Sequence, residues 1–406
     1  MAKLSGERRF DWVPAAMAGG ALALGLIFRF WGAGSQPLWL DEAYSAFAAD
    51  HGFAFLWQVV PHYETHPPFY YSLLRCWRLI VGDGLLAGRL LGLLCGLATL
   101  VVGGIIAHRL ARLTRMHDRE RRGLIAVTIV LLSLHPLIIE MSRQLRPYPV
   151  MILAYAAVVP ALLRLVEDSI RRRMPDRGAL LAVFAVQALM LWLHSLGPLY
   201  ALAIALALGV AVFSPGLTRA DWRWLIGGET IVGLVYLPAF LILREQAPGW
   251  VASSWLTFTT TSLPARVGQI YLDWNFWARL VGLGAAMIGT LLLLGRIGGR
   301  RVTVILIVLA GVPVALSLLL SAAVAPVFLD RTLSPVAVPA LLLVGTGLVW
   351  SGRRAWIGWL ALLVIAGSMV GIDRLLLAKG PLQDWYGTIA WLDPRLGPGD
   401  RVWSYP

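Results

Sequence analysis

The stretch PLWLDEAYSAFAADHG, residues 37–52, places two adjacent carboxylates just past the first long apolar run of the chain. Asp41 and Glu42 open a segment rich in alanine, and an acid at that position favours the start of a helix. Asp41 is therefore either an N-terminal helix cap or a functional group held beside an apolar region. Other features of the sequence distinguish between these two interpretations.

The composition points to a membrane protein. Of 406 residues, 58% are hydrophobic and only 14% are charged, whereas a soluble domain carries about 25% charged residues. Helices satisfy their own backbone polar groups in lipid and need roughly 20 apolar residues to cross it. We therefore predict an all-α polytopic membrane protein with about eleven transmembrane helices. The predicted spans are 13–32, 85–108, 123–141, 149–166, 179–195, 197–213, 224–243, 276–295, 303–322, 335–350 and 356–373.

The basic residues predict the orientation of these spans. The net charge is +13, which in a soluble chain would suggest a nucleic-acid partner. Here the arginines gather in short loops, most densely in 109–122, as the positive-inside rule expects. We infer no nucleic-acid partner and a cytoplasmic N-terminus. Lys3, Arg8 and Arg9 precede the first span, which is too long for a typical signal peptide, so we expect it to stay uncleaved.

The segment 68–82 is predicted to lie along the membrane surface. It is short and carries Arg75 and Arg78, whose long side chains can reach the interface. Counting it as a span would turn every later arginine loop outward.

With 68–82 on the surface, the first extracytoplasmic loop is 33–84, and residues 1–373 form one membrane domain. The extracytoplasmic tail, 374–406, reads as a short amphipathic helix, a Gly-Pro-Gly turn and a strand, which either pack on the membrane domain or belong to a longer region.

Two cysteines, Cys76 and Cys95, both lie within apolar segments. Each is expected to be a buried hydrophobe, with neither a disulfide nor a metal between them.

A second polar group follows in the same loop, in HYETHPPFYY, residues 62–71. Glu64 and His66 precede two prolines that suit the start of a helix. A capped interfacial helix explains this pattern simply. Alternatively, Glu64 returns a second carboxylate to the boundary where Asp41 lies, which suits general-base catalysis or cation binding.

Arginines on the predicted outer side form the third group. Arg143 and Arg146 lie in LHPLIIEMSRQLRPYPV, residues 134–150, and Arg331 precedes the tenth span. Since they oppose the positive-inside trend, we interpret them as ligands for an anion such as a phosphate. Interfacial snorkelling, and for Arg331 pairing with Asp330, are the alternatives.

Taken in order, LDEAYSAFAA, YETHPPFYY, SRQLRPYPV and the Arg331-Thr-Leu-Ser-Pro run resemble the C-type glycosyltransferases. The resemblance is narrower to the group of protein O-mannosyltransferases, aminoarabinose transferases and lipopolysaccharide-core glycosyltransferases, and it covers roughly residues 10 to 400. It implies transfer of a hexose or pentose from an undecaprenyl- or decaprenyl-type phosphate donor to a lipid, glycan or protein. The reaction would take place on the outer face of the plasma (inner) membrane.

The resemblance also implies roles for individual residues. Asp41 is the expected general base, with Glu42 and Glu64 as further catalytic residues and inversion at the anomeric carbon. Contacts with phosphate or sugar are expected from His66, Arg143, Arg146, Tyr148 and Arg331.

A divalent metal is left open by the sequence. Relatives commonly carry an acid where this chain has Gln144, a weaker ligand. Asp41, Glu64 and Glu140 are weak metal candidates. His135 is expected to pack between helices, while His194 and Tyr200 are candidates for the acceptor side.

The main alternative function is a transporter or a flippase for lipid carriers. Transporters place ionisable groups near the middle of the membrane. No acid lies at the centre of a predicted span here, and the polar groups gather at one face, which favours an enzyme. A non-catalytic membrane scaffold is the third interpretation.

Overall fold

The computed structural model describes residues 12–213, 217–254, 256–272, 275–349, 355–380 and 383–402. These residues form α-helices and short 3₁₀ turns, with no strand among them. The helices are α1 (Val13–Phe30), α2 (Leu40–Asp50), α3 (Gly52–Gln58), α4 (Phe69–Val81), α5 (Leu85–Leu113), α6 (Asp118–Leu134), α7 (Pro136–Ser142), α8 (Tyr148–Ile170), α9 (Arg177–Leu193), α10 (Gly197–Val212), α11 (Arg219–Ser253), α12 (Leu263–Tyr271), α13 (Phe276–Leu294), α14 (Gly299–Ala323), α15 (Asp330–Leu333), α16 (Ala337–Leu348), α17 (Ala355–Ala378) and α18 (Trp385–Leu392).

Each predicted span corresponds to a helix or a bent pair of helices. Within the described residues, eight helices are long and apolar enough to cross a membrane, and the bent pair α6–α7 makes a ninth. Two further predicted spans, α9 and α10, are apolar but shorter, with 17 and 16 residues. The all-α membrane fold is therefore confirmed, whereas the count of eleven spans stays a prediction.

The predicted span 123–141 is two helices rather than one. α6 ends at Leu134 and α7 begins at Pro136, with a bend of 60° between them. Pro136 cannot donate the backbone hydrogen bond that would continue α6, so it starts a new helix instead. His135 caps α7, its Nδ1 accepting from the backbone N–H of Ile138 at 3.4 Å. The proline thus redirects the chain toward the turn that carries Arg143 and Arg146.

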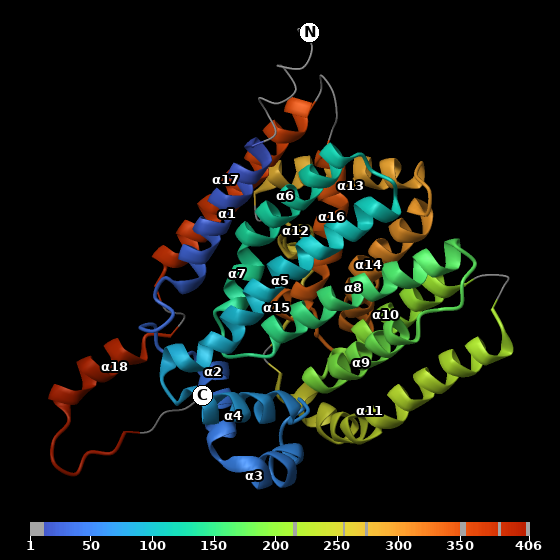
Figure 1. The fold of residues 1–406 in the computed structure, drawn as a ribbon. Coiled ribbons are helices and arrows are strands. Elements are labelled where there is room, and N and C mark those ends of the chain that lie inside the picture. The colour runs from blue at the N-terminus through green and yellow to red at the C-terminus, as the bar shows by residue number, and fades with distance from the viewer. Residues whose placement is uncertain are drawn as a thin grey trace.

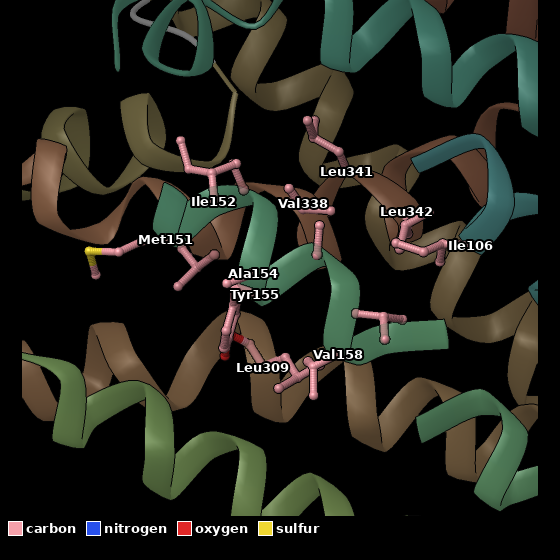
Figure 2. Close-up of a cluster of buried hydrophobic side chains, with 14 of the residues drawn as sticks. Ile106, Met151, Ile152, Ala154, Tyr155, Val158, Leu309, Val338, Leu341 and Leu342 are labelled. Atoms are coloured by element: carbon pink, nitrogen blue, oxygen red, sulfur yellow. The ribbon is translucent and has the colours of Figure 1, made fainter. Parts of the chain in front are cut away.

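The core of the bundle lies around α8 and α16, the most deeply buried of the long helices. Figure 2 shows Tyr155 and Val158 of α8 packed among Leu309 of α14 and Val338 of α16. The Tyr155 hydroxyl donates to the Leu309 carbonyl at 2.8 Å, so the polar atom of this buried ring is paired. The helices α1, α11 and α17 are much less buried and cover the periphery.

The first loop folds into helices at one end of the bundle. Figure 1 shows α2, α3 and α4 together at the lower end, away from the N-terminal end of α1. α4 has only 13 residues and ends at Gly82, whose φ of 91° is a left-handed conformation that suits glycine. Its length fits the predicted surface helix and is too short for a span.

One cysteine differs from expectation. Cys95 is buried in α5, but Cys76 is exposed on α4. A short helix that packs one face on the bundle leaves its other face uncovered, and Cys76 lies on that face. Neither cysteine forms a disulfide.

The tail forms the predicted helix and turn. α18 has no buried residue, and residues 397–400 form a turn with Gly399 at a φ of 100°. The described part of the predicted strand, 401–402, is not extended in a sheet, and the rest lies outside the described residues. The tail contacts the first loop through Gln383, whose Oε1 accepts from the Leu40 N–H at 2.8 Å.

Candidate active site

Asp41 is free of the capping role that an isolated acid would have. It is the second residue of α2. The capping hydrogen bond at this helix start is made by Glu42 instead, whose Oε2 accepts from the Trp39 N–H at 3.4 Å. The Asp41 carboxylate faces Arg331, with Oδ2 and Nη2 3.4 Å apart, and both side chains are partly exposed. The structure thus brings together two predicted site residues that are 290 positions apart in the sequence.

Arg331 is available to Asp41 because Asp330 has another partner. Asp330 pairs with Arg266 of α12 at 3.2 Å. The Arg331 guanidinium lies over the Trp39 ring, 5.1 Å from its centroid, and its buried Nε has no hydrogen-bond partner. The alternative that Arg331 only pairs with its neighbour is therefore wrong.

Arg146 lies beneath Asp41 and is almost fully buried. Its Nη1 donates to the Asp41 carbonyl and to Ser45 Oγ, both at 3.2 Å, and its side chain hydrogen-bonds to Tyr71. Burial lowers the pKa of Arg146, but Tyr148, Tyr71, Asp41 and Glu64 together raise the pKa above its ordinary value. Arg146 therefore stays positive, and its buried Nε has no partner.

Glu42 fixes the position of α2. It is buried and pairs with Arg89 of α5, with Oε2 and Nη2 2.7 Å apart. Its Oε1 also accepts from the Leu145 N–H at 2.8 Å, in the turn that carries Arg146. Since both oxygens are engaged, this geometry suits a positioning role better than proton transfer, and the predicted catalytic role of Glu42 stays a prediction.

Glu64 and His66 both lie near Arg146. Glu64 Oε1 accepts from the His66 N–H at 3.1 Å. His66 Nδ1 lies 3.0 Å from Ser195 Oγ, and its ring packs against that of His194, with centroids 4.2 Å apart. Tyr148, the first residue of α8, contacts both sides, with its ring near His194 and near the Arg146 guanidinium.

We expect His66 to make stability depend on pH. Burial of most of the ring, then Arg146 and Arg331, lower the pKa of His66 to about 3. Between pH 6.5 and 3 the unfolded chain therefore binds a proton that the folded protein does not, so stability falls as pH falls. The slope from one such histidine is at most about 1.4 kcal/mol per pH unit.

The measurement is thermal unfolding in detergent from pH 4 to 7. His66→Asn keeps an oxygen acceptor for Ser195 and removes the titration, so its unfolding temperature should depend less steeply on pH than that of the wild type. Equal slopes for the two proteins would contradict the assignment.

Arg143 has a structural use. It donates to the carbonyls of Phe28 and Trp31 at 2.9 and 2.6 Å and fastens the end of α1 to the turn after α7. A positive charge at a helix C-terminus is also favourable. Its predicted contact with substrate stays a prediction.

A cavity of about 160 Å³ lies beside this turn. It is lined by Arg143 and Glu140 and also reaches Glu42, Arg89 and Gln144.

The metal candidates do not form a metal site. Among the described residues, no three His, Cys, Asp or Glu side chains are grouped so as to hold an ion. Asp41 faces Arg331, Glu64 accepts from a backbone N–H, and Glu140 lies in the separate cavity. Two guanidinium groups beside Asp41 also disfavour a cation. Within the described residues these donor groups are therefore not assembled around a common point, and the possible divalent metal stays a prediction.

Two residues at the site are missing from the sequence predictions. Arg89 anchors Glu42, and Trp39 supports Arg331. Arg89 carried a usable signal, because a lone arginine inside an apolar helix demands a partner. Trp39 carried none, since an aromatic residue beside a membrane is ordinary.

Comparisons with known proteins give the fold. No family model matches the sequence, and no curated protein matches it. Among solved structures, ArnT from Cupriavidus metallidurans in the apo state matches with a TM-score of 0.57 and 16% identity, covering 87% of this chain and 64% of ArnT. ArnT bound to undecaprenyl phosphate matches with a TM-score of 0.57 and 16% identity, covering 92% of this chain and 73% of that one.

The oligosaccharyltransferase AglB from Archaeoglobus fulgidus also matches. In complex with an inhibitory peptide and a dolichol-phosphate, it gives a TM-score of 0.53 and 11% identity, covering 96% of this chain and 59% of AglB. The chain thus spans less than two thirds of the length of apo ArnT and of AglB. The chain has the C-type glycosyltransferase fold.

Proposed function

We propose that the protein transfers a sugar from a polyprenyl-phosphate donor to an acceptor hydroxyl or amine. The observation that carries the proposal is the cluster of Asp41, Arg146 and Arg331 at the end of the bundle where α2 and α4 lie. A carboxylate and two guanidinium groups, each with a buried Nε that has no partner, suit a general base beside a phosphate. ArnT, a neighbour in fold, has been solved with undecaprenyl phosphate.

The chemistry requires one proton transfer and one bond exchange. Asp41 takes the proton from the acceptor O–H or N–H as that atom attacks the anomeric carbon. The bond between the anomeric carbon and the phosphate oxygen breaks, and the phosphate keeps the electron pair. Arg146 and Arg331 stabilise the charge that develops there, so the leaving group needs no general acid.

The Asp41–Arg331 pair suggests an order of events. In the structure Arg331 is the partner of the Asp41 carboxylate. The phosphodiester of the donor carries one negative charge on two free oxygens, which can accept paired hydrogen bonds from Arg331 in place of the carboxylate. Donor binding would then release Asp41 toward the acceptor, so that the base becomes available when the donor is in place.

The site is proposed to face the extracytoplasmic side of the plasma (inner) membrane, where the acceptor would be a glycolipid, a glycan or a protein. This orientation follows from the arginine loops at the opposite end of the bundle. If this orientation is correct, a tag inserted at residue 116 should be protected from membrane-impermeant labelling reagents added outside the cell.

A flippase for lipid carriers is the alternative. One acid does lie between helices: Glu229 of α11 accepts from Gln187 of α9 at 3.0 Å. It lies on a peripheral helix, whereas the cluster at Asp41 combines a base with phosphate ligands. The observations therefore favour transfer.

Arg331→Ala tests the phosphate site. We expect it to weaken binding of polyprenyl phosphate by about 10- to 100-fold, since it removes a hydrogen-bonded charge from the phosphate. Binding of acceptor should change little. The measurement is titration of purified protein with a short polyprenyl phosphate and, separately, with an acceptor.

Arg279→Ala is the matched control, because it also removes one positive charge, and Arg279 donates to the Pro264 carbonyl of α12 rather than to Asp41 or Asp330. Carrier binding by this variant should stay close to wild type. Equal losses of donor and acceptor binding in Arg331→Ala would argue against a phosphate site.

A further inference from the structure

A second cavity lies at the other end of the bundle. It has a volume of about 500 Å³ and lies between the C-terminal ends of α5 and α8 and the α13–α14 loop. The stretch of α5 from Arg89 to Leu113, 25 residues long, separates it from the candidate active site by roughly 36 Å. It is therefore distinct from that site and lies at the end that the arginine loops predict to be cytoplasmic.

Arginines form one half of its lining. Five of them surround the cavity with a single carboxylate, Glu167: Arg109, Arg112, Arg115, Arg164 and Arg171. Glu167 pairs with Arg171 at 2.6 Å, and Arg164 lies near three acids on α8 and the loop after it. Arg109, Arg112 and Arg115 have no carboxylate partner within the described ranges. The cavity is therefore strongly positive.

Arg115 occupies a position that usually belongs to glycine. Its φ of 53° is left-handed, and Met116 N–H donates back to the Ala111 carbonyl at 2.8 Å, as at a helix end where glycine is common. Arg172, just past the end of α8, has a φ of 52°. Arginine at such positions costs backbone energy that glycine would avoid. Both helices thus end with an arginine where the backbone conformation favours glycine, and Arg115 lines the cavity whereas Arg172 lies beside it in the sequence.

The remaining lining residues are apolar. Leu113, Leu163, Ile170 and Ile297 contribute it. Gly298 brings the α13–α14 loop so close to Ile170 that a Cβ there would meet the Ile170 Cδ1 at 2.6 Å. The loop therefore closes one wall of the cavity against α8, and Ile170 and Ile297 remain largely exposed beside it.

We propose that this cavity binds the phosphate head group of an anionic membrane lipid, with the first part of its acyl chains on the apolar wall. Arginine suits phosphate through paired hydrogen bonds, and basic pockets between helices at the cytoplasmic surface suit such lipids. The positive-inside rule alone explains arginines in a loop. It does not require them to line a cavity that has an apolar wall.

The test is native mass spectrometry of the full chain with phosphatidylglycerol, phosphatidylcholine or glycerol 3-phosphate added. We expect phosphatidylglycerol to bind about tenfold or more tightly than phosphatidylcholine. Glycerol 3-phosphate, which has the head-group phosphate but no chains, should not displace it. Displacement by glycerol 3-phosphate at equal concentration would show a site for soluble phosphate and overturn the proposal.

Two double variants distinguish lipid binding in the cavity from non-specific attraction of the lipid to positive charge. Arg112→Gln with Arg115→Gln should lower phosphatidylglycerol affinity about tenfold. Arg119→Gln with Arg300→Gln removes the same charge from exposed positions that do not line the cavity, and should leave the affinity nearly unchanged. Equal losses in the two would overturn the proposal. If the cavity double variant does not fold, Arg112→Gln alone, at an exposed position, gives the same comparison against Arg119→Gln.

Discussion

Asp41→Asn is expected to lower the rate of sugar transfer by about 100- to 10,000-fold, the range that a general base contributes. The amide has the shape of the carboxylate but does not accept the proton from the acceptor. Because Asp41 is partly exposed and makes no capping bond, the protein should remain folded. Binding of the carrier phosphate should persist, since Arg331 then loses a competing carboxylate.

Asp50→Asn is the control for this variant. Asp50 ends the same helix and pairs with Arg78 at 3.2 Å, away from Arg146 and Arg331. Its transfer rate should stay near that of the wild type. Transfer by Asp41→Asn at the wild-type rate would show that Asp41 is not the base.

Arg89→Met is expected to destabilise the protein by about 3–5 kcal/mol, because it leaves the Glu42 charge buried without its partner. Arg89 also donates to the carbonyls of Ala33, Gln36 and Pro37, which hold the chain between α1 and α2. Transfer should be lost as well, since the same contacts set the position of Asp41. The measurement is the free energy of unfolding in detergent.

The control is Arg78→Met. Arg78 pairs with Asp50 and Asp83, both of which are mostly exposed, and such pairs contribute at most about 1 kcal/mol. A second comparison is Arg89→Met combined with Glu42→Gln, which removes the unpaired charge and should recover part of the stability. A loss in Arg89→Met no larger than in Arg78→Met would show that the buried pair does not hold the first loop in place.

The sequence was enough to predict most helices and part of the site. Apolar length predicts a helix wherever about 20 such residues occur. Arg146 and Arg331 were identified as site candidates because they oppose the positive-inside trend in the predicted orientation. The bend at His135 was not predicted, although Pro136 carried the signal. Hydropathy counts Pro136 as one residue among many, whereas its missing N–H redirects the chain.

The sequence did not predict which of two similar side chains contacts a given residue on a distant helix. Arg143 and Arg146 are three residues apart and look alike in the sequence, yet Arg143 binds the carbonyls at the end of α1 and Arg146 lies beneath Asp41. Likewise, Asp41 and Glu42 are adjacent, but only Glu42 meets Arg89. On a helix, neighbouring side chains point about 100° apart. Which one meets a given partner therefore depends on packing between distant helices.

The most direct test of the central claim is a transfer assay with the purified protein in lipid vesicles. A panel of short polyprenyl-phosphate sugars would be supplied with a membrane extract as the source of acceptor, and both free polyprenyl phosphate and the glycosylated product would be measured by mass spectrometry. Our account predicts that one donor is consumed, with product and free carrier phosphate formed in equal amounts. Tight binding of a donor without turnover, together with its movement across the bilayer, would contradict it and indicate a flippase.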